Sequence, residues 1–278
     1  MCGIVGAIAD RNVLPILMDG LQRMEYRGYD SAGVAIREAS GALKRFRSLG
    51  KVGNLKQLVD SSDVTGDLGI AHTRWATHGV PAERNAHPHM SGVRVAVVHN
   101  GIVENHNTLR DRLLEQGYSF TSETDTEVIA HLLAHKLESG RDLFSAVLEA
   151  SQELTGAYAL AVASPEDGDR IVVTRAGSPL VIGLGEGENF IASDVTALLP
   201  VTRSFIFLEE GDIAEVRRDG VTIYNSAGKL VEREIKQSTM SDANVDKGPY
   251  RHYMLKEIFE QPGVISETLE GRIHQGRL

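Results

Sequence analysis

The sequence predicts an α+β fold in which strands on both sides flank a helical block. Short apolar runs typical of strands lie in residues 2–103 and return in 157–225, where Gly, Asp and Asn separate them at hairpin spacing. Between them, residues 107–150 carry apolar side chains at helical spacing. Because strands and helices are segregated and do not alternate one by one, we expect sheets that are covered by helices.

The first part of the chain is predicted to contain five strands and one helix. Apolar runs alternate there with turn signals such as RGYDSAG. The helix is expected at 13–26 and the strands at 2–9, 33–36, 43–50, 68–74 and 93–103. The polar stretch ATHGVPAERNAHPHMSG at 76–92 indicates a long loop, and loops of that length often carry function.

Helices and then strands are expected in the following part. The helices are predicted at 108–116, 124–140 and 143–154, and the strands at 157–163, 170–176, 180–185, 189–193, 205–210, 212–216 and 221–225. Thr124 and Glu127 have the spacing of a capping box at the start of the second helix. One domain is therefore expected over 2–236. Residues 237–278, a polar linker at 237–250 and then the helical stretch 252–261, are expected to connect it to a further domain.

Composition excludes several classes of protein. The 278 residues carry a net charge of −9 and no basic run, so a nucleic-acid partner is not expected. The single cysteine excludes an intramolecular disulfide and a multi-cysteine zinc site. The chain has no signal-peptide start and no apolar run of about 20 residues. We expect a cytoplasmic protein without a membrane partner and without a cofactor.

Cys2 is the candidate nucleophile because of its position. Removal of Met1, which a small second residue permits, places the thiol beside a free α-amine with a pKa of about 7.7–8.0. That amine can accept the thiol proton directly or through water, so nucleophile and base would share one residue. The competing interpretation is a cysteine that packs as a small hydrophobe in the first strand.

Asn100 and Gly101 are candidates for an oxyanion hole, and Arg74 and Asp125 for a substrate clamp. Asn100 and Gly101 follow the run VAVVH, which places an amide and a backbone N–H at a strand end, although an Asn-Gly pair taken alone favours a hairpin turn. Arg74 can fork onto a carboxylate and Asp125 can accept protons from an amine, so together they would hold an amino acid at both ends. The simpler alternatives are that Arg74 forms a surface ion pair and that Asp125 is a favourable charge at a helix N-terminus.

Histidines and aromatic residues leave alternatives open. Histidines crowd the region from 72 to 99, and His131 and His135 share a helix face, so a metal site is an alternative. Carboxylate partners at metal-ligand spacing, as in H-E-x-x-H, are absent from the sequence, and we expect no metal. Tyr26, Tyr29 and Trp75 fit a core or the wall of a pocket equally well.

Motifs distributed over the whole chain point to one family. They are MCGIVG, EYRGYDSAG, GIAHTRWATHG, NAHPH, VVHNGIVEN, SETDTEVIAHL, GSPLVIGLG, ENFIASD, FIFLEEGDIAE and YRHYMLKEIFEQP. Together they resemble the glutaminase domain of the glutamine–fructose-6-phosphate aminotransferase family. The resemblance implies an N-terminal-nucleophile hydrolase fold, a four-layer αββα sandwich with two mainly antiparallel sheets. It also implies that Cys2 attacks the glutamine amide, that Asn100 and Gly101 stabilise the oxyanion, and that water cleaves the resulting glutamyl thioester.

The resemblance further implies the residues that bind and enclose the substrate L-glutamine. They are Arg74 for the α-carboxylate, Asp125 for the α-amino group, and Thr77, His78 and Gly101 for further contacts. Trp75 is expected on a loop that covers glutamine and gates the passage of ammonia. Arg27 is expected to organise the site close to the nucleophile.

The resemblance implies that the domain that binds the acceptor of ammonia is not among these 278 residues. In the family, the last motif leads into a sugar-phosphate isomerase domain, which is expected in a full-length, homo-oligomeric enzyme that converts fructose 6-phosphate to glucosamine 6-phosphate. A sister family that makes phosphoribosylamine has a similar Cys-Gly-Ile start, so a glutaminase that serves another acceptor is the nearest alternative. A non-catalytic glutamine-binding module is a third possibility, which applies if Met1 stays attached.

Overall fold

The computed structural model describes residues 2–238 and 249–269. The chain divides into two compact units, Met1–Ser238 and Thr239–Leu278, which are described separately. The division falls at 238, close to the predicted domain end at 236, while the assignment of the second segment as a connector stays a prediction. In the part of the chain that is described, no helix has the length and apolar character needed to cross a bilayer.

Two antiparallel sheets form the centre of the first unit. Within the described residues, the eight-stranded sheet has the order β15-β11-β9-β10-β1-β4-β2-β3 and the seven-stranded sheet the order β14-β13-β12-β8-β7-β6-β5. The first sheet comprises β1 (Gly3–Ala9), β2 (Ser31–Arg37), β3 (Leu43–Leu49), β4 (Leu68–Arg74), β9 (Val181–Leu184), β10 (Glu188–Ala192), β11 (Ser204–Phe207) and β15 (Ile235–Gln237). The second comprises β5 (His89–Ser91), β6 (Val95–Val103), β7 (Gly156–Ala163), β8 (Arg170–Ala176), β12 (Ile213–Arg217), β13 (Val221–Tyr224) and β14 (Leu230–Val231).

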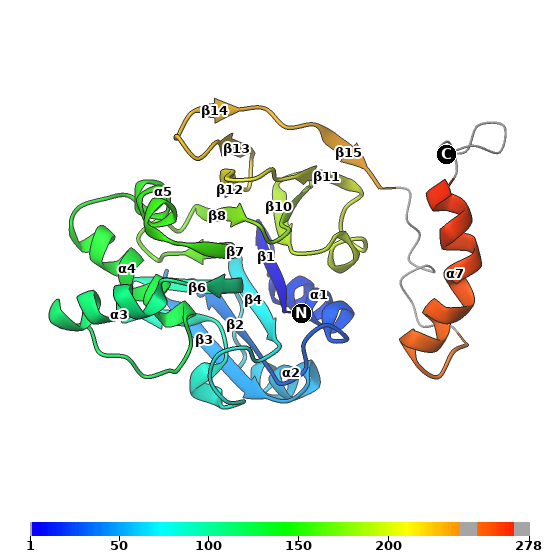
Figure 1. Ribbon diagram of the computed structural model, residues 1–278, viewed down its shortest axis with the longest axis horizontal. Coiled ribbons are helices and arrows are strands. Elements are labelled where there is room, and N and C mark those ends of the chain that lie inside the picture. The colour runs from blue at the N-terminus through cyan, green and yellow to red at the C-terminus, as the bar shows by residue number, and fades with distance from the viewer. Residues whose placement is uncertain (1, 239–248, 270–278) are drawn as a thin grey trace. The chain divides into compact units, whose positions relative to one another are not determined.

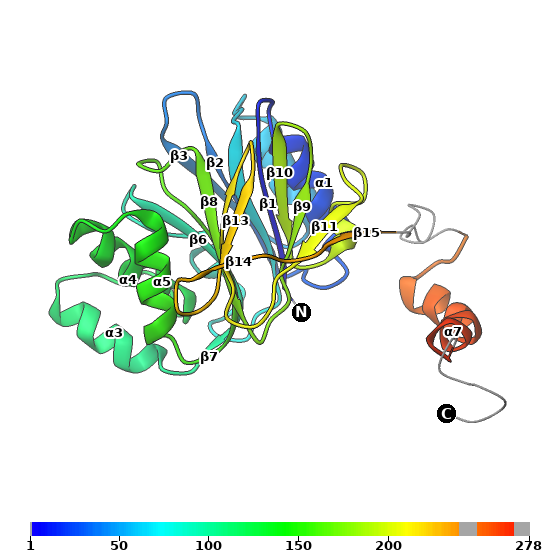
Figure 2. The same ribbon diagram turned by 90° about the horizontal axis from the view of Figure 1, so that it is seen from above.

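Helices cover the outer face of each sheet (Figures 1 and 2). Helices α1 (Leu14–Met24) and α2 (Val52–Asp60) pack on the eight-stranded sheet. Helices α3 (His106–Glu115), α4 (Thr126–Glu138) and α5 (Leu143–Glu153) lie on the side of the seven-stranded sheet. The layer order helix, sheet, sheet, helix confirms the predicted αββα sandwich.

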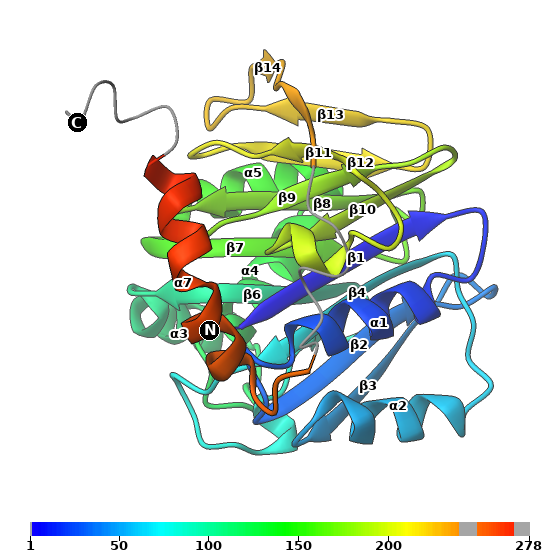
Figure 3. The same ribbon diagram turned by 90° about the vertical axis from the view of Figure 1, so that its right-hand side faces the viewer.

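The position of β1 explains its continuous apolar sequence. It lies between β4 and β10 in the middle of its sheet, with α1 on one face and the second sheet on the other (Figure 3). All residues of Gly3–Ala9 are buried, since a strand covered on both faces has no solvent side on which to place polar residues. Ile4 and Ile8 enter the core between the sheets, whereas Leu113 and Leu133 belong to the core under α3–α5.

Several elements and one cap differ from the predictions. Helix α2 and the short strands β14 and β15 were not expected, and β5 lies inside the segment predicted to be a loop. The capping box is only half formed: the Thr124 hydroxyl accepts from Glu127 N at 3.3 Å, but the Glu127 carboxylate turns to the preceding segment. It accepts there from Thr121 N at 2.9 Å and from the buried Ser122 N at 2.7 Å, because neither N–H group has a strand partner.

The described part of the second unit consists mainly of α7 (Tyr253–Leu269), which includes the predicted helical stretch. Pro262 lies inside the helix, and Met254, Ile258 and Phe259 expose more than half of their surface. The predicted linker lies for its greater part outside the described residues.

Candidate active site

Cys2 directly precedes the central strand β1. Its Sγ accepts a hydrogen bond from Trp75 N at 3.3 Å and lies 3.6 Å from Trp75 O, to which the thiol can donate. Burial raises the pKa of the Cys2 thiol above its ordinary value, and the Trp75 N–H opposes that shift because it stabilises the thiolate. The protonated thiol therefore needs a base before it can act as a nucleophile at neutral pH.

Asn100 and Gly101 lie within β6, opposite Ala159 and Tyr158 of β7. The hairpin turn that the Asn-Gly pair favours is therefore wrong, because the strand continues through both residues to Val103. The Asn100 Nδ2 donates to Cys2 O at 3.2 Å, which brings the amide beside the candidate nucleophile. Gly101 has φ +133°, and a Cβ there would lie 2.0 Å from Ala157 O, so only glycine fits this close approach.

A cavity of about 260 Å³ opens at these residues. Six of the predicted site residues line it: Cys2, Arg27, Trp75, Thr77, Asn100 and Gly101. Ile102, Ser178, Pro179 and Ser193 complete the wall. The motifs GSPLVIGLG and ENFIASD contain the last three of these, but nothing local in either motif shows that its polar side chains face Cys2. The lining does not include Arg74, His78 or Asp125.

Arg74 and Asp125 are outside the cavity lining, and both form hydrogen bonds with backbone groups. The Arg74 guanidinium donates to His78 O and, at 3.0 Å, to Gly79 O, and it lies 3.8 Å from the Asp30 carboxylate. The Asp125 carboxylate accepts from Val103 N at 2.8 Å. In this structure, Arg74 orders the loop that follows Trp75, and Asp125 anchors the end of β6. The predicted surface ion pair for Arg74 is wrong, because its side chain is only 3% exposed.

Arg27 and the aromatic residues lie at the edge of the cavity. Arg27 pairs with Asp194, and its Nε donates to the Tyr26 hydroxyl at 3.0 Å. Trp75 is 46% exposed and packs edge-to-face against Tyr29, with 5.4 Å between the ring centroids. Because Tyr26 and Tyr29 are also about half exposed, all three aromatic side chains lie at the surface near the cavity and not in a core.

Four of the five histidines between positions 72 and 99 are buried, and His78 is half-buried. Burial lowers the pKa of His72 to about 3 and moves the pKa values of His87, His89 and His99 in the same direction, so all four are neutral. Over residues 2–238 and 249–269, no group of three or more His, Cys, Asp or Glu side chains is placed to hold a metal ion.

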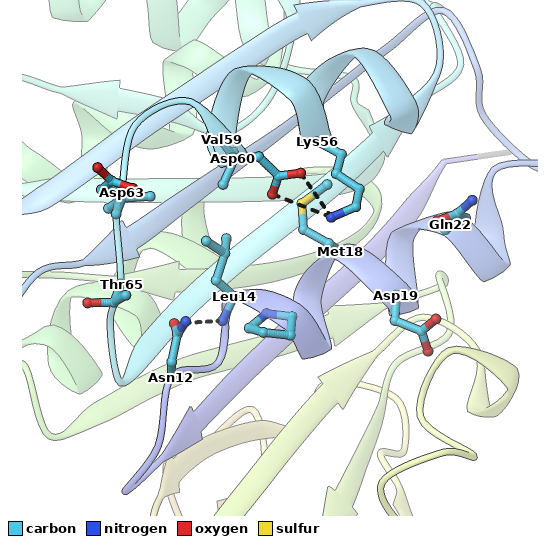
Figure 4. Close-up of a pocket in the computed structure, with 12 residues that line it drawn as sticks. Asn12, Leu14, Met18, Asp19, Gln22, Lys56, Val59, Asp60, Asp63 and Thr65 are labelled. Carbon is cyan, nitrogen blue, oxygen red and sulfur yellow. Dashed lines mark hydrogen bonds and ion pairs between the residues drawn. The ribbon is translucent and has the colours of Figure 1, made fainter.

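A larger cavity, of about 510 Å³, lies between α1 and α2 (Figure 4). Two bonds join residues of its lining: Lys56 pairs with Asp60 at 3.1 Å, and the Asn12 side chain accepts from Leu14 N at 3.2 Å. Its lining contains no nucleophilic thiol and no buried donor pair. Chemistry, not size, therefore selects the Cys2 cavity as the candidate active site.

Comparisons with known proteins agree with this choice. Residues 72–200 match the family model of the glutamine amidotransferase domain. The chain is 60% identical over its whole length to glutamine–fructose-6-phosphate aminotransferase (isomerizing) of Pseudomonas aeruginosa, of which it covers 46%. It is 58% identical to the protein of the same name from Shewanella oneidensis, with 98% of the chain and 45% of that protein aligned. The chain thus spans about half the length of the curated relatives it matches.

Solved structures show the same fold. Glutamine phosphoribosylpyrophosphate amidotransferase from B. subtilis, complexed with ADP and GMP, superposes with a TM-score of 0.70 and 25% identity, over 82% of this chain and 50% of that one. A glutamine aminotransferase class-II domain protein from Silicibacter pomeroyi superposes with a TM-score of 0.55 at 15% identity, over 81% of this chain and 99% of that one, which supports the fold alone. The chain thus carries a match to a glutamine amidotransferase domain at residues 72–200, and its curated homologues of about 60% identity are glutamine–fructose-6-phosphate aminotransferases.

Proposed function

We propose that this chain hydrolyses L-glutamine to glutamate and ammonia through a glutamyl thioester on Cys2. The observation that carries the proposal is that the Cys2 thiol, the Asn100 amide and Gly101 line one cavity. Nucleophile and oxyanion donors are the two parts that acyl transfer needs within reach of one carbonyl carbon.

The first half of the reaction forms the thioester. After Met1 is removed, the α-amine of Cys2 takes the thiol proton, and Sγ attacks the side-chain amide carbon of glutamine. Negative charge moves to the amide oxygen, where the Asn100 Nδ2–H and a backbone N–H at Gly101 stabilise it. The tetrahedral intermediate then collapses and its C–N bond breaks. The leaving nitrogen takes the proton from the α-ammonium group of Cys2 and departs as ammonia.

The second half returns the enzyme to its starting state. The same α-amine takes a proton from water as the water oxygen attacks the thioester carbon, and the oxyanion donors act again. Collapse of this intermediate breaks the C–S bond, and the thiolate recovers the proton. Glutamate leaves, and the thiol and amine are as they were before the first step.

Substrate contacts are assigned within the same proposal. Arg74 holds the α-carboxylate and Asp125 the α-amino group, with Thr77 and His78 adding contacts. Both charged groups are now bonded to the backbone, so glutamine binding exchanges part of those hydrogen bonds for bonds to the substrate. Trp75 and Arg27 enclose the bound side chain from the exposed edge of the cavity.

The proposed acceptor of ammonia is fructose 6-phosphate. The support is the identity of about 60% with enzymes named for that sugar, against 25% with the phosphoribosylpyrophosphate enzyme. In a full-length, homo-oligomeric protein, a sugar-phosphate isomerase domain would bind the sugar and use the ammonia. A cytoplasmic setting is part of the proposal, because a reducing compartment keeps a nucleophilic thiol free.

The test compares three forms of the chain. The Met1-processed protein, a Cys2→Ala variant and a form that retains Met1, each verified by intact mass, are assayed for glutamate and ammonia release. Turnover by the processed form alone is expected. Glutamine binding without turnover in a verified free-Cys2 sample would overturn the proposal and indicate a binding module, and turnover by Cys2→Ala would exclude Cys2 as the nucleophile.

A further inference from the structure

We propose that His72 is a positioning residue of this site, which holds the Asn100 carboxamide so that its Nδ2 points to the nucleophile. The inference rests on the proposed glutaminase function and adds a residue that lies outside the cavity lining. Its basis is a hydrogen bond that joins the two sheets directly behind the oxyanion donor.

The hydrogen-bond partners of His72 determine which ring nitrogen carries the proton. His72 Nε2 lies 2.9 Å from His99 O and 3.0 Å from Asn100 Oδ1. Both partners are carbonyl oxygens that only accept, so Nε2 must be the donor to both. Nδ1 has no hydrogen-bond partner among the described residues, and in this tautomer it carries a lone pair, not a buried unpaired N–H.

This donor fixes the orientation of the Asn100 amide. Asn100 Oδ1 accepts from His72 while Nδ2 donates to Cys2 O at 3.2 Å. Rotation of the amide by 180° would place the NH₂ group against the Nε2–H and the oxygen against the Cys2 carbonyl. Both contacts would then be repulsive, so His72 selects the orientation in which an N–H can stabilise the oxyanion.

The bond also connects two separate layers. His72 lies on β4 opposite Ile4 of β1, in the sheet that carries Cys2, whereas Asn100 lies on β6 of the other sheet. Nucleophile and oxyanion donor therefore come from different sheets, and the His72 hydrogen bond crosses the space between them. A displacement of about 1 Å between such groups is enough to reduce a reaction rate strongly.

The surroundings of His72 keep it in the required state. The side chain is fully buried, its ring lies 4.1 Å from the His87 ring, and Arg74 and His99 also face it. Removal from water and nearby positive charge both oppose a second proton. The ring thus remains a neutral donor throughout the pH range in which the enzyme would act.

The test uses two substitutions at position 72 and one matched control. His72→Leu removes the donor, whereas His72→Gln keeps a neutral N–H near the position of Nε2. His131→Leu removes another buried histidine, which bonds the Ser91 hydroxyl at 2.8 Å and does not line the Cys2 cavity. For each Met1-processed protein, kcat and KM for glutamine are measured beside the rate at which iodoacetamide alkylates Cys2, a reaction that needs no oxyanion hole.

The expected pattern separates positioning from structural damage. His72→Leu should lower kcat by about 10- to 100-fold with little change in KM or alkylation rate, because the amide is misdirected and not removed. His72→Gln should recover most of kcat, and His131→Leu should leave it unchanged. A His72→Leu enzyme with wild-type kcat, or one in which alkylation falls in parallel with kcat, overturns the inference. Wild-type turnover in the same assay tests the proposed function separately.

One measurement needs no substitution. The ¹⁵N shifts of the His72 ring in the wild-type protein report its tautomer directly, and the Nε2–H form is expected from neutral to mildly acidic pH. Detection of the Nδ1–H tautomer would overturn the inference even if the variants failed to fold.

Discussion

Gly101 shows at the scale of one residue how the backbone limits the chemistry of the site. Its φ of +133° and the 2.0 Å approach that a Cβ would make to Ala157 O leave room for no side chain. The same close approach keeps β6 against β7 and leaves Asn100 beside Cys2. A side chain at this position would therefore disturb both the sheet and the proposed oxyanion donors.

We predict that Gly101→Ala destabilises the protein by more than about 3 kcal/mol, since it adds a clash with backbone to an unfavourable φ. Gly140→Ala is the matched control, because Gly140 also has a positive φ, +85°, but nothing lies within 4 Å of its added Cβ. Gly140→Ala should lower the free energy of unfolding by only about 1 kcal/mol. Urea denaturation measures both. Equal losses for the two variants would show that the clash at Gly101 is relieved.

Glu127 has its effect at the scale of an element, the start of α4. Its side chain is 4% exposed and accepts from Thr121 and Ser122, through backbone N–H and hydroxyl groups alike. Burial alone would raise the pKa of this carboxyl, but these hydrogen bonds hold the pKa below its usual value. The carboxylate thus ties the segment before α4 to the helix that begins beside Asp125.

We predict that Glu127→Ala lowers the free energy of unfolding by about 2–4 kcal/mol, because it leaves the buried N–H and hydroxyl groups of Ser122 without their carboxylate acceptor and also removes the bonds to Thr121. Glu115→Ala, on the exposed end of α3, should change it by less than about 0.5 kcal/mol. Chemical denaturation of both variants checks the prediction. A loss at Glu127 no larger than the loss at Glu115 would mean that other groups or water satisfy the freed donors.

The whole molecule is expected to lose stability in mild acid because of its buried histidines. Burial holds the pKa values of His72, His87, His89 and His99 below the value of about 6.5 that they have when unfolded. Their contribution is therefore fully present above pH 6.5 and is lost as the pH falls below it, because the unfolded chain then binds more protons.

Between pH 7.5 and 5.5, His72, whose pKa is about 3, should remove about 1 kcal/mol from the free energy of unfolding, and the other three histidines should add to this loss. Urea denaturation at the two pH values measures this change. The shifted carboxyl groups, Glu127 among them, titrate at lower pH and contribute little in this window. A stability that stayed constant from pH 7.5 to 5.5 would contradict neutral burial of the histidines.

The division of the chain gives a prediction about truncation. The unit that ends at Ser238 contains both sheets and both cores, so a chain that ends there should keep its melting temperature within about 4 °C and should keep the proposed glutaminase activity. A chain that ends at Glu234 also loses β15, which pairs with β11, and should melt earlier. Thermal melts of the three lengths check this. Loss of folding in the chain that ends at Ser238 would show that the second unit is required.

The sequence by itself determined the α+β class, the approximate places of most elements and the candidate nucleophile. These follow from local information: β4 occupies the predicted 68–74 because apolar periodicity is read within one window, and Cys2 stands out through its place in the chain. The resemblance then supplied roles for the site residues, of which six meet at one cavity.

Only the tertiary structure decided which polar groups face each other. The Asn-Gly pair has the local signal of a turn, yet pairing with β7 keeps it extended, because a full ladder of hydrogen bonds outweighs a local preference. Glu127 has the spacing of a capping residue but bonds the preceding segment instead. His72 forms a hydrogen bond with Asn100, which lies in the other sheet and 28 positions later in the sequence. Such partners are brought together by packing of distant segments, which no local sequence pattern encodes.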